Sequence, residues 1–315
     1  MTDTPLVSVL HVSRHYGLLQ AVQDVSFSLQ KGEVLGFLGP NGAGKSTTMQ
    51  IITGNLAPSA GRVHIAGHDL LEQPKAAKAE IGYLPEQPPL YRELTVDEYL
   101  RFCARLNRIR RDKVAAAVRR AKSRCGLEAV GRRLIGNLSK GYQQRVGIAQ
   151  AIIHSPAVVV LDEPTVGLDP IQIREIRDLI RDLGAEHGVI LSTHILPEVQ
   201  MTCNRVQIIN QGRLVFSDSI ENLNRRMDTT TLLVAFDAPP PLAALEAIDG
   251  VERAEDLGDG RFRLHHAAGA APAPRLAEAA VSGGWGLREL TPEHKTLEQI
   301  FIDITSSEHA VEDAA

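Results

Sequence analysis

The segment that most constrains the fold is a glycine-rich run, Gly39-Pro40-Asn41-Gly42-Ala43-Gly44-Lys45-Ser46-Thr47. An apolar stretch, residues 34–38, precedes it and a helix-like stretch follows, so the order is strand, loop, helix. Glycines let backbone N–H groups converge on phosphate oxygens, and the N-terminal end of the helix adds positive charge. Lys45 supplies a neutralising cation and Ser46 a hydroxyl ligand for Mg²⁺. An ordinary glycine-rich loop is the plain alternative, but this context favours a nucleotide-binding α/β domain.

Composition narrows the class of protein. A chain of 315 residues exceeds the size that one core usually reaches, so two domains are expected. The net charge of -4 is unlike that of nucleic-acid-binding proteins, which are generally basic, and no nucleic-acid partner is expected. The scattered Cys103, Cys125 and Cys203 look like reduced thiols. We expect no signal peptide, and no apolar run approaches the roughly 20 residues of a membrane helix, so any membrane role requires another chain.

The spacing of apolar residues predicts the parts of the first domain. Residues 6–35 alternate apolar and polar positions, as half-buried antiparallel strands do. Helical spacing from Thr95 to about Gly126 predicts a helical insertion, within a subdomain at about 90–155. Buried-strand runs at 157–161 and 189–191, separated by a helix over 171–183, are typical of a parallel sheet.

A second chemical signature is an apolar strand that ends in two acids, Val158-Val159-Val160-Leu161-Asp162-Glu163. Ligands of open α/β sheets sit at the carboxyl ends of the strands. Asp162 is placed to hold Mg²⁺, and Glu163 is placed to polarise the water that attacks a γ-phosphate. A helix cap is the alternative, since Pro164 follows, but the upstream phosphate loop favours the catalytic interpretation.

A third set of motifs makes the assignment specific. It consists of Leu138-Ser139-Lys140-Gly141-Tyr142-Gln143-Gln144-Arg145, Gly167-Leu168-Asp169-Pro170 and Leu191-Ser192-Thr193-His194. Together with the phosphate loop and the acidic strand end, this order over about residues 6–220 resembles the ABC ATPases. The matching family motifs are the Walker A loop, the LSGGQ-type signature, Walker B, the D-loop and the H-loop.

This resemblance implies how ATP is held. In that family two ATPase domains face head to tail, so each ATP lies between one subunit's phosphate loop and the other's signature. The chain has one copy of each motif and therefore must pair, as a homodimer or with a second ABC ATPase. Ser139 and the backbone N–H of Gly141 would reach the γ-phosphate across the interface, with Asp169 in the D-loop. His194 would contact the γ-phosphate from the same subunit, and Tyr16 matches the aromatic that stacks on adenine.

The sequence departs from the family pattern at two places. Glu86 stands where a Gln usually binds Mg²⁺ and links to the transporter, and Gln87 lies one residue beyond, so either of them is a candidate. In the signature, Lys140 and Tyr142 replace a Gly and a Gln. These changes look like the ATPases of ABC-2 type exporters, particularly the gliding-motility-like branch.

The helical insertion also carries many basic residues between Arg101 and Arg124, opposed only by Asp112. A solvated helical face is the plain interpretation. Because this subdomain faces the membrane partner in the family, attraction to anionic headgroups or to an acidic intracellular loop is the alternative.

Composition changes after residue 224, so we expect a nucleotide-binding domain over 1–224 and an accessory domain over 225–315. The order of strand-like and helical segments between Thr231 and Leu290 suits a small split β-α-β domain of the α+β class. Residues 267–274 are Ala/Pro-rich and are expected to form a loop. Thr296-Leu297-Glu298-Gln299 is typical of a capping box that opens a helix. No catalytic constellation is evident here, which favours a dimerising or regulatory part.

The resemblance therefore implies an ATP-binding and ATP-hydrolysing, Mg²⁺-dependent motor subunit of an ABC exporter. It would lie in the cytoplasm, on the inner face of the membrane, bound to a separate integral-membrane permease. The fold expected is a P-loop NTPase of the ABC ATPase type, with an antiparallel β subdomain and a helical insertion. The main alternative is a soluble ABC ATPase that acts on ribosomes or DNA. Such proteins generally join two ATPase domains in one chain or insert a long coiled coil, and neither is seen here. The transported substrate is not encoded in these motifs.

Overall fold

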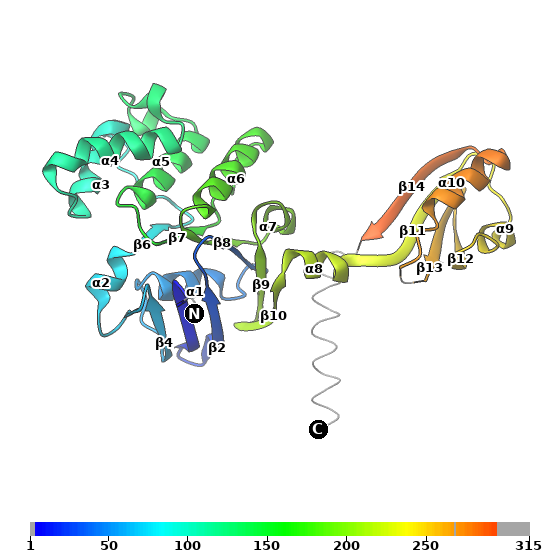
Figure 1. The fold of residues 1–315 in the computed structure, drawn as a ribbon, viewed down its shortest axis with the longest axis horizontal. Coiled ribbons are helices and arrows are strands. Elements are labelled where there is room, and N and C mark those ends of the chain that lie inside the picture. Colours follow the sequence, from blue (N-terminus) through cyan, green and yellow to red (C-terminus); the bar gives the residue numbers. More distant parts are fainter. Residues whose placement is uncertain (1–3, 268, 295–315) are drawn as a thin grey trace. The chain divides into compact units, whose positions relative to one another are not determined.

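The computed structural model describes residues 4–267 and 269–294 of the chain. Contacts between Cα atoms divide it into two compact units, Met1–Ile220 and Glu221–Ala315, close to the change of composition near residue 224. The chain trace of both units is shown in Figure 1. In the described ranges, no helix is long and apolar enough to cross a bilayer.

The first unit begins with an antiparallel sheet whose strand order is β2-β1-β4-β5. Val7 and Val9 of β1 lie opposite Leu29 and Phe27 of β2, and these four side chains are buried, because alternate residues of a strand face the same side. The bounds are β1 (Val7–Tyr16), β2 (Leu19–Leu29), β4 (Ala60–Ile65) and β5 (His68–Asp69).

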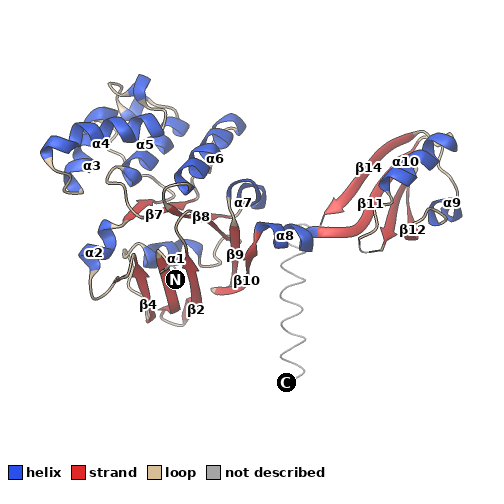
Figure 2. Cartoon of the chain, in the orientation of Figure 1, coloured by secondary structure: helices blue, strands red, loops and turns tan. Residues whose placement is uncertain are grey.

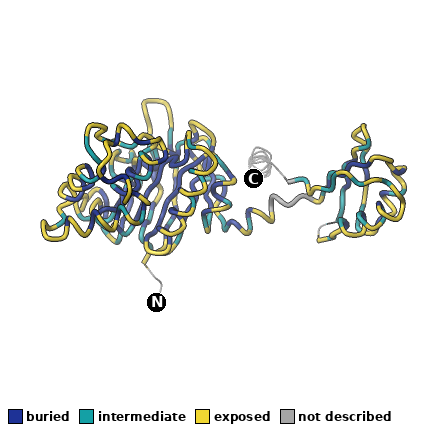
Figure 3. Tube along the Cα trace, turned by 90° about the horizontal axis from the view of Figure 1, so that it is seen from above, coloured by how far each residue is buried: buried dark blue, intermediate teal, exposed yellow. Residues whose placement is uncertain are grey.

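A six-stranded sheet with the order β10-β9-β3-β8-β7-β6 forms the centre of the first unit. Its strands β3, β7 and β8 are mostly apolar and are buried along their whole length (Figure 3), as in parallel sheets covered on both faces. Only the edge strand β10 pairs antiparallel. The bounds are β3 (Val34–Leu38), β6 (Ile81–Leu84), β7 (Val158–Asp162), β8 (Gly188–Thr193), β9 (Arg205–Asn210) and β10 (Arg213–Ser219).

Helices cover both faces of this sheet. Helix α1 (Lys45–Ile52) packs between the two sheets, where Met49 and Ile51 share one apolar cluster with residues of both. The opposite face lies under a second cluster formed with the helical insertion and α6 (Figure 2). The remaining helices are α2 (Pro74–Ala79), α3 (Val96–Leu106), α4 (Arg111–Arg124), η1 (Glu128–Val130), η2 (Ile135–Asn137), α5 (Lys140–Ile152), α6 (Pro170–Gly184) and α7 (Leu196–Thr202).

A capping box opens the helical insertion. The Oγ1 atom of Thr95 accepts from the backbone N–H of Glu98 at 3.3 Å, and the Glu98 carboxylate accepts from the backbone N–H of Thr95 at 2.9 Å. Two exposed N–H groups of the first turn are thereby satisfied, which fixes where α3 begins.

The second unit begins within α8 (Ile220–Met227) and continues as a β-α-β-β-α-β fold in which every paired strand is antiparallel. Its sheet order, β12-β13-β11-β14, places β13 between β11 and β12, so the expected α+β class and split β-α-β arrangement are confirmed. The bounds are β11 (Asp228–Phe236), α9 (Leu242–Glu246), β12 (Val251–Gly258), β13 (Arg261–His266), α10 (Ala273–Ser282) and β14 (Leu287–His294).

One expectation about the second unit is wrong, and another falls on residues that the structure does not describe. The segment 267–274 is not a loop throughout, because α10 already begins at Ala273; Pro274 is tolerated there since the first turn needs no intrahelical N–H donor. The capping box expected at Thr296-Leu297-Glu298-Gln299 lies outside the described residues.

Candidate functional site

The phosphate loop joins β3 to α1 through left-handed glycines. Gly42 and Gly44 have φ angles of +80° and +107°, which L side chains rarely adopt. A Cβ atom on Gly44 would also press against the backbone carbonyl of Ala21. Gly44 is the N-cap of α1, so the free N–H groups of that helix begin directly where the loop turns. This is the geometry of an anion cradle.

A cavity of about 530 Å³ opens beside this loop and collects residues from five separate parts of the sequence. It brings together most of the expected site: Tyr16, Asn41, Gly42, Gly44, Lys45, Ser46, Thr47, Glu86, Glu163 and His194. Gly39, Pro40, Ala43, Gln87 and Asp162 are not among its lining residues. Sequence analysis missed three others, Leu19, Ala21 and Val166. No chemical signal marks them, since they are apolar positions of a strand and a loop.

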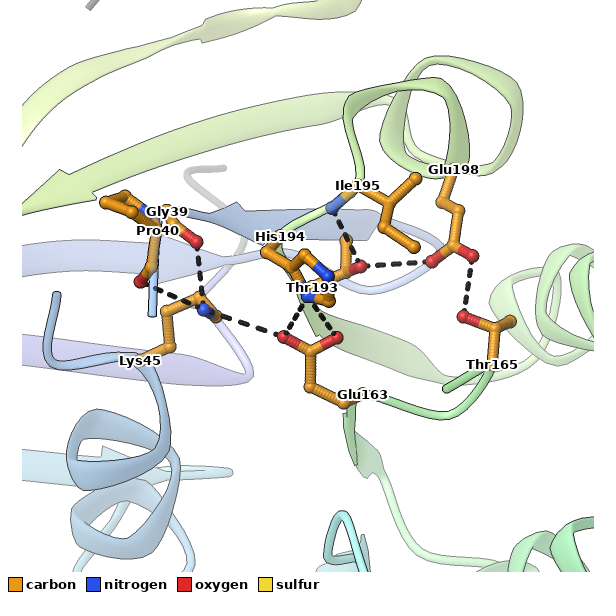
Figure 4. Close-up of polar contacts among 9 residues, drawn as sticks. All are labelled: Gly39, Pro40, Lys45, Glu163, Thr165, Thr193, His194, Ile195 and Glu198. Atoms are coloured by element: carbon orange, nitrogen blue, oxygen red, sulfur yellow. Dashed lines mark hydrogen bonds and ion pairs between the residues drawn. The ribbon is translucent and has the colours of Figure 1, made fainter. Parts of the chain in front are cut away.

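Lys45 is buried and holds the loop closed. Its Nζ donates to the carbonyl oxygens of Gly39 at 2.8 Å and Pro40 at 3.2 Å, and lies 3.5 Å from Oε1 of Glu163 (Figure 4). Gly39 and Pro40 therefore contribute backbone carbonyls to the lysine and do not line the cavity themselves. Lys45 itself lines the cavity.

Glu163 and His194 meet because β7 and β8 are parallel neighbours. Asp162 at the end of β7 lies opposite Ser192 of β8, so the residues that follow each strand emerge at one edge of the sheet. Glu163 has a left-handed backbone with φ of +48°, and its N–H donates to the carbonyl of Ser192 at 2.9 Å. His194 Nδ1 lies 3.0 Å from each carboxylate oxygen of Glu163 (Figure 4). A carboxylate is thereby held in place at the wall of the cavity.

Asp162 lies just below the cavity wall and has spare capacity to bind a cation. Its side chain is 3 % exposed, and Oδ1 has no hydrogen-bond partner among the described residues. Burial raises the pKa of Asp162, while the hydroxyls of Ser192 and Ser46 oppose that shift. An orphaned carboxylate oxygen next to the Ser46 hydroxyl fits a hard cation such as Mg²⁺. Among residues 4–267 and 269–294, no group of three or more His, Cys, Asp or Glu side chains is arranged to hold a metal ion.

The structure separates the two candidates in the segment after β6. Glu86 lines the cavity and its charge raises the pKa of Asp162, although burial contributes more. Gln87, one residue further along, does not line it. Glu86 is thus the side chain of this pair that faces the phosphate loop.

Tyr16 stands at the rim of the cavity with 45 % of its surface exposed. The guanidinium carbon of Arg14 lies 4.8 Å from its ring centroid, in a cation–π contact that fixes one face of the ring. An exposed aromatic face held in place in this way can stack on a planar base.

The signature residues line a different cavity, of about 430 Å³. Ser139 caps α5 by accepting from the N–H of Tyr142 at 3.4 Å, and Asp169 caps α6 by accepting from the N–H of Gln172 at 2.9 Å. The Lys140 ammonium lies over Gly167 of the D-loop, where a side chain would collide with it. The cavity is lined by Gly126, Ser139, Gly141, Tyr142, Arg145, Asp169, Ile171, Gln172 and Glu175. Within one chain, the signature and the phosphate loop therefore do not share a cavity.

Part of the basic run in the helical insertion is neutralised internally. Lys122 and Arg101 both pair with Asp97, at 2.7 Å and 3.8 Å, and Arg124 pairs with Glu186. These pairs reduce the positive charge that this surface presents.

Comparisons with known proteins agree with the geometry. The family model described as ABC transporter matches residues 22–166. The bacitracin transport ATP-binding protein BcrA of Bacillus licheniformis is 30% identical over 301 residues, 95% of this chain and 97% of its own length. The linearmycin resistance ATP-binding protein LnrL of Bacillus subtilis is also 30% identical, over 94% of this chain and 96% of its own. A solved ATP-binding subunit of an ABC transporter superposes with a TM-score of 0.64 at 32% identity, over 70% of this chain and 92% of that one.

Proposed function

The chain belongs to the family of ABC transporter ATP-binding proteins, and on this premise we propose that it is the ATP-hydrolysing motor subunit of an ABC-2 type exporter. The observation that carries the proposal is the phosphate-loop cavity, in which Lys45, Glu163 and His194 converge. A cation, a carboxylate and an imidazole around a cradle of N–H groups are the parts that ATP hydrolysis requires.

ATP binding follows from the loop and the rim of the cavity. The N–H groups that begin α1 and the Lys45 ammonium would bind the β- and γ-phosphates, and Tyr16 would stack on the adenine. Ser46, Asp162 and Glu86 would hold Mg²⁺, with Gln87 as the alternative to Glu86. When bound, Mg²⁺ would neutralise phosphate charge.

Hydrolysis is assigned to the Glu163 carboxylate. It would accept a proton from water as the water oxygen bonds to the γ-phosphorus, while the bond from that phosphorus to the bridging oxygen of ADP breaks. His194 would orient the carboxylate through the hydrogen bond at Nδ1, which leaves its other ring nitrogen, Nε2, for the γ-phosphate. Lys45 would stabilise negative charge that develops on the phosphate oxygens.

Pairing of two chains follows from the separate signature cavity. Ser139, Gly141 and Asp169 lie away from the phosphate loop of their own chain, so they would reach the ATP of a second chain. ATP would hold the dimer closed, and loss of the γ-phosphate would release it. We propose a homodimer, or a heterodimer with a second ABC ATPase.

The output would pass to a separate integral-membrane permease, with the chain peripheral on the cytoplasmic face of the membrane. The names of BcrA and LnrL refer to bacitracin transport and linearmycin resistance, and both relatives match this chain over nearly its full length, the second unit included. We assign residues 1–224 to the ATPase domain and residues 225–315 to an accessory domain with a dimerising or regulatory role.

Co-purification tests the proposal. Tagged Glu163→Gln protein is expressed, membranes are solubilised in mild detergent with ATP and Mg²⁺, and bound proteins are identified by mass spectrometry. Recovery of a multi-span membrane protein with the variant, but not with Lys45→Ala, is the expected result. Ribosomal or DNA-associated partners without a permease would overturn the exporter assignment in favour of a soluble ABC ATPase.

A further inference from the structure

A buried carboxylate on α7 joins the two loops that carry Glu163 and His194. Glu198 is 1 % exposed, and each of its oxygens accepts one hydrogen bond. Thr165 Oγ1 donates to Oε1 at 2.6 Å, and Thr193 Oγ1 donates to Oε2 at 3.0 Å (Figure 4). Both threonines are themselves buried, so these contacts are shielded from water.

The positions of the two threonines make this contact relevant to the site. Thr165 follows Glu163 by two residues, and Thr193 directly precedes His194. His194 Nδ1 contacts the Glu163 carboxylate at 3.0 Å, which closes a ring of five residues joined by side-chain contacts and short chain segments. The five residues are Glu163, Thr165, Glu198, Thr193 and His194. Moving either loop would therefore strain the contacts of the other.

A second set of contacts fixes the same ring to its surroundings. The N–H of Ile195, on the far side of His194, donates to Thr193 Oγ1 at 3.2 Å. Arg177 of α6 approaches Glu198, with its NH2 atom 3.9 Å from Oε1. The Thr193 hydroxyl therefore contacts both Glu198 and the backbone of Ile195, so it holds the chain before and after His194.

If residue 198 served only to pack the interior, an apolar side chain would stabilise the fold more than a buried carboxylate does. Burying an ionised group is unfavourable unless hydrogen bonds and an opposite charge compensate it. Leu196 and Val199 already supply apolar packing from the same helix. A carboxylate differs from an apolar side chain in that it can accept from two donors at once, and here one donor lies in the loop after β7 and the other at the end of β8.

We propose that Glu198 is a positioning residue that sets the distance between Glu163 and His194 through Thr165 and Thr193. The inference rests on the proposed ATP hydrolysis at Glu163. Glu198 does not line the phosphate-loop cavity, so it acts on the reaction only through the two loops. Removing one of its acceptor oxygens should slow the chemical step and leave ATP binding in place, because the phosphate cradle is built by another segment.

Glu198→Gln tests this with little change of volume. The amide keeps one acceptor oxygen and replaces the other with an N–H donor, so the threonine hydroxyl on that side can no longer donate to residue 198 and can only accept from it. We expect kcat for ATP to fall about tenfold or more, as displacement of a catalytic group does. KM and the affinity for a fluorescent ATP analogue should stay within about twofold of wild type, since uniform binding is preserved.

Threonine variants keep the proposal testable if Glu198→Gln does not fold. Thr165→Val and Thr193→Val remove the hydroxyl at nearly constant shape and should lower kcat, whereas Thr165→Ser and Thr193→Ser should restore it. Thr202→Val is the matched control, because Thr202 lies on the same helix, is buried, and its Oγ1 has no partner among the described residues. The Thr202→Val substitution removes a buried hydroxyl of the same kind but leaves the contacts among Glu163, Thr165, Glu198, Thr193 and His194 intact.

A His194→Ala background separates positioning from general stability. If Glu198 acts through His194, Glu198→Gln should reduce kcat much less in that background than in wild type. An unchanged kcat in Glu198→Gln, an equal loss in both backgrounds, or failure of both serine variants to restore kcat would overturn the inference. Absence of ATPase activity in the wild-type chain together with its permease would instead overturn the proposed function, so the two failures are distinguishable.

Discussion

His194 Nδ1 lies 3.0 Å from both carboxylate oxygens of Glu163, so one imidazole N–H is shared across the whole carboxylate. The Lys45 ammonium approaches Oε1 of the same group at 3.5 Å. Glu163 is therefore held between the imidazole of His194 and the ammonium group of Lys45, and it lines the phosphate-loop cavity. This arrangement defines what each substitution in the site should change.

Glu163→Gln should abolish turnover but retain ATP binding. The amide keeps the shape of the side chain and loses the ability to accept a proton, which typically costs 10²–10⁴-fold in rate. ATPase assays and size-exclusion chromatography with ATP and Mg²⁺ measure the two effects, and a dimer trapped by ATP is expected. Lys45→Ala is the control that should lose binding as well. Brisk turnover by Glu163→Gln would contradict the assigned role.

Glu86→Ala should raise the Mg²⁺ concentration needed for half-maximal ATPase activity, because Glu86 lines the cavity beside Asp162. Gln87→Ala is the neighbouring control and should leave that concentration close to wild type. A Mg²⁺ titration of both variants at saturating ATP decides between them. If only Gln87→Ala were impaired, the assignment would shift by one residue.

Thr95→Ala should destabilise the first unit by about 1 kcal/mol, the usual cost of losing an N-cap. Hydrogen bonds from the backbone N–H and then the hydroxyl of Thr95 hold the pKa of Glu98 below its usual value. The stabilisation from this box is therefore present above the ordinary glutamate pKa and is lost as pH falls through the lowered one. Denaturant unfolding at neutral and acidic pH should show the wild-type advantage shrinking in acid. Thr95→Ser should retain the wild-type stability. A stability difference between wild type and Thr95→Ala that did not change with pH would argue against the capping box.

The three cysteines should resist thiol reagents while the chain is folded. Burial raises the pKa of Cys103 to about 11 and of Cys125 to about 12, and burial followed by the charge of Glu198 raises the pKa of Cys203. At pH 8 almost none of these groups is the reactive thiolate. Colour development with a disulfide reagent should be slow in buffer and should reach three equivalents in guanidinium. Rapid reaction of one native thiol would contradict this.

The parts of the fold that a motif or a periodicity encodes could be predicted. The glycines of the phosphate loop and the apolar strand that ends in Asp162 and Glu163 each carry a local signal, and the P-loop NTPase fold is confirmed. The end of the loop expected over residues 267–274 was wrong by two residues, because α10 begins at Ala273 and a proline such as Pro274 suits the first turn of a helix as well as a loop.

Long-range pairings could not be predicted because no local pattern records them. Glu198 sits between apolar residues in a short helix, and only the folded chain brings it to Thr165, 33 positions away. For Glu86 and Gln87, the sequence offered two candidates, and the backbone path after β6 determines which side chain lines the cavity.

The separation of the phosphate-loop cavity from the signature cavity has a genetic consequence for the proposed dimer. Each complete nucleotide site would draw one half from each chain. A chain damaged at Lys45 and another damaged at Ser139 would then assemble into a mixed dimer with one site carrying both lesions and the other carrying neither. Two alleles that each fail alone would complement in the same cell, whereas two lesions within one half-site would not.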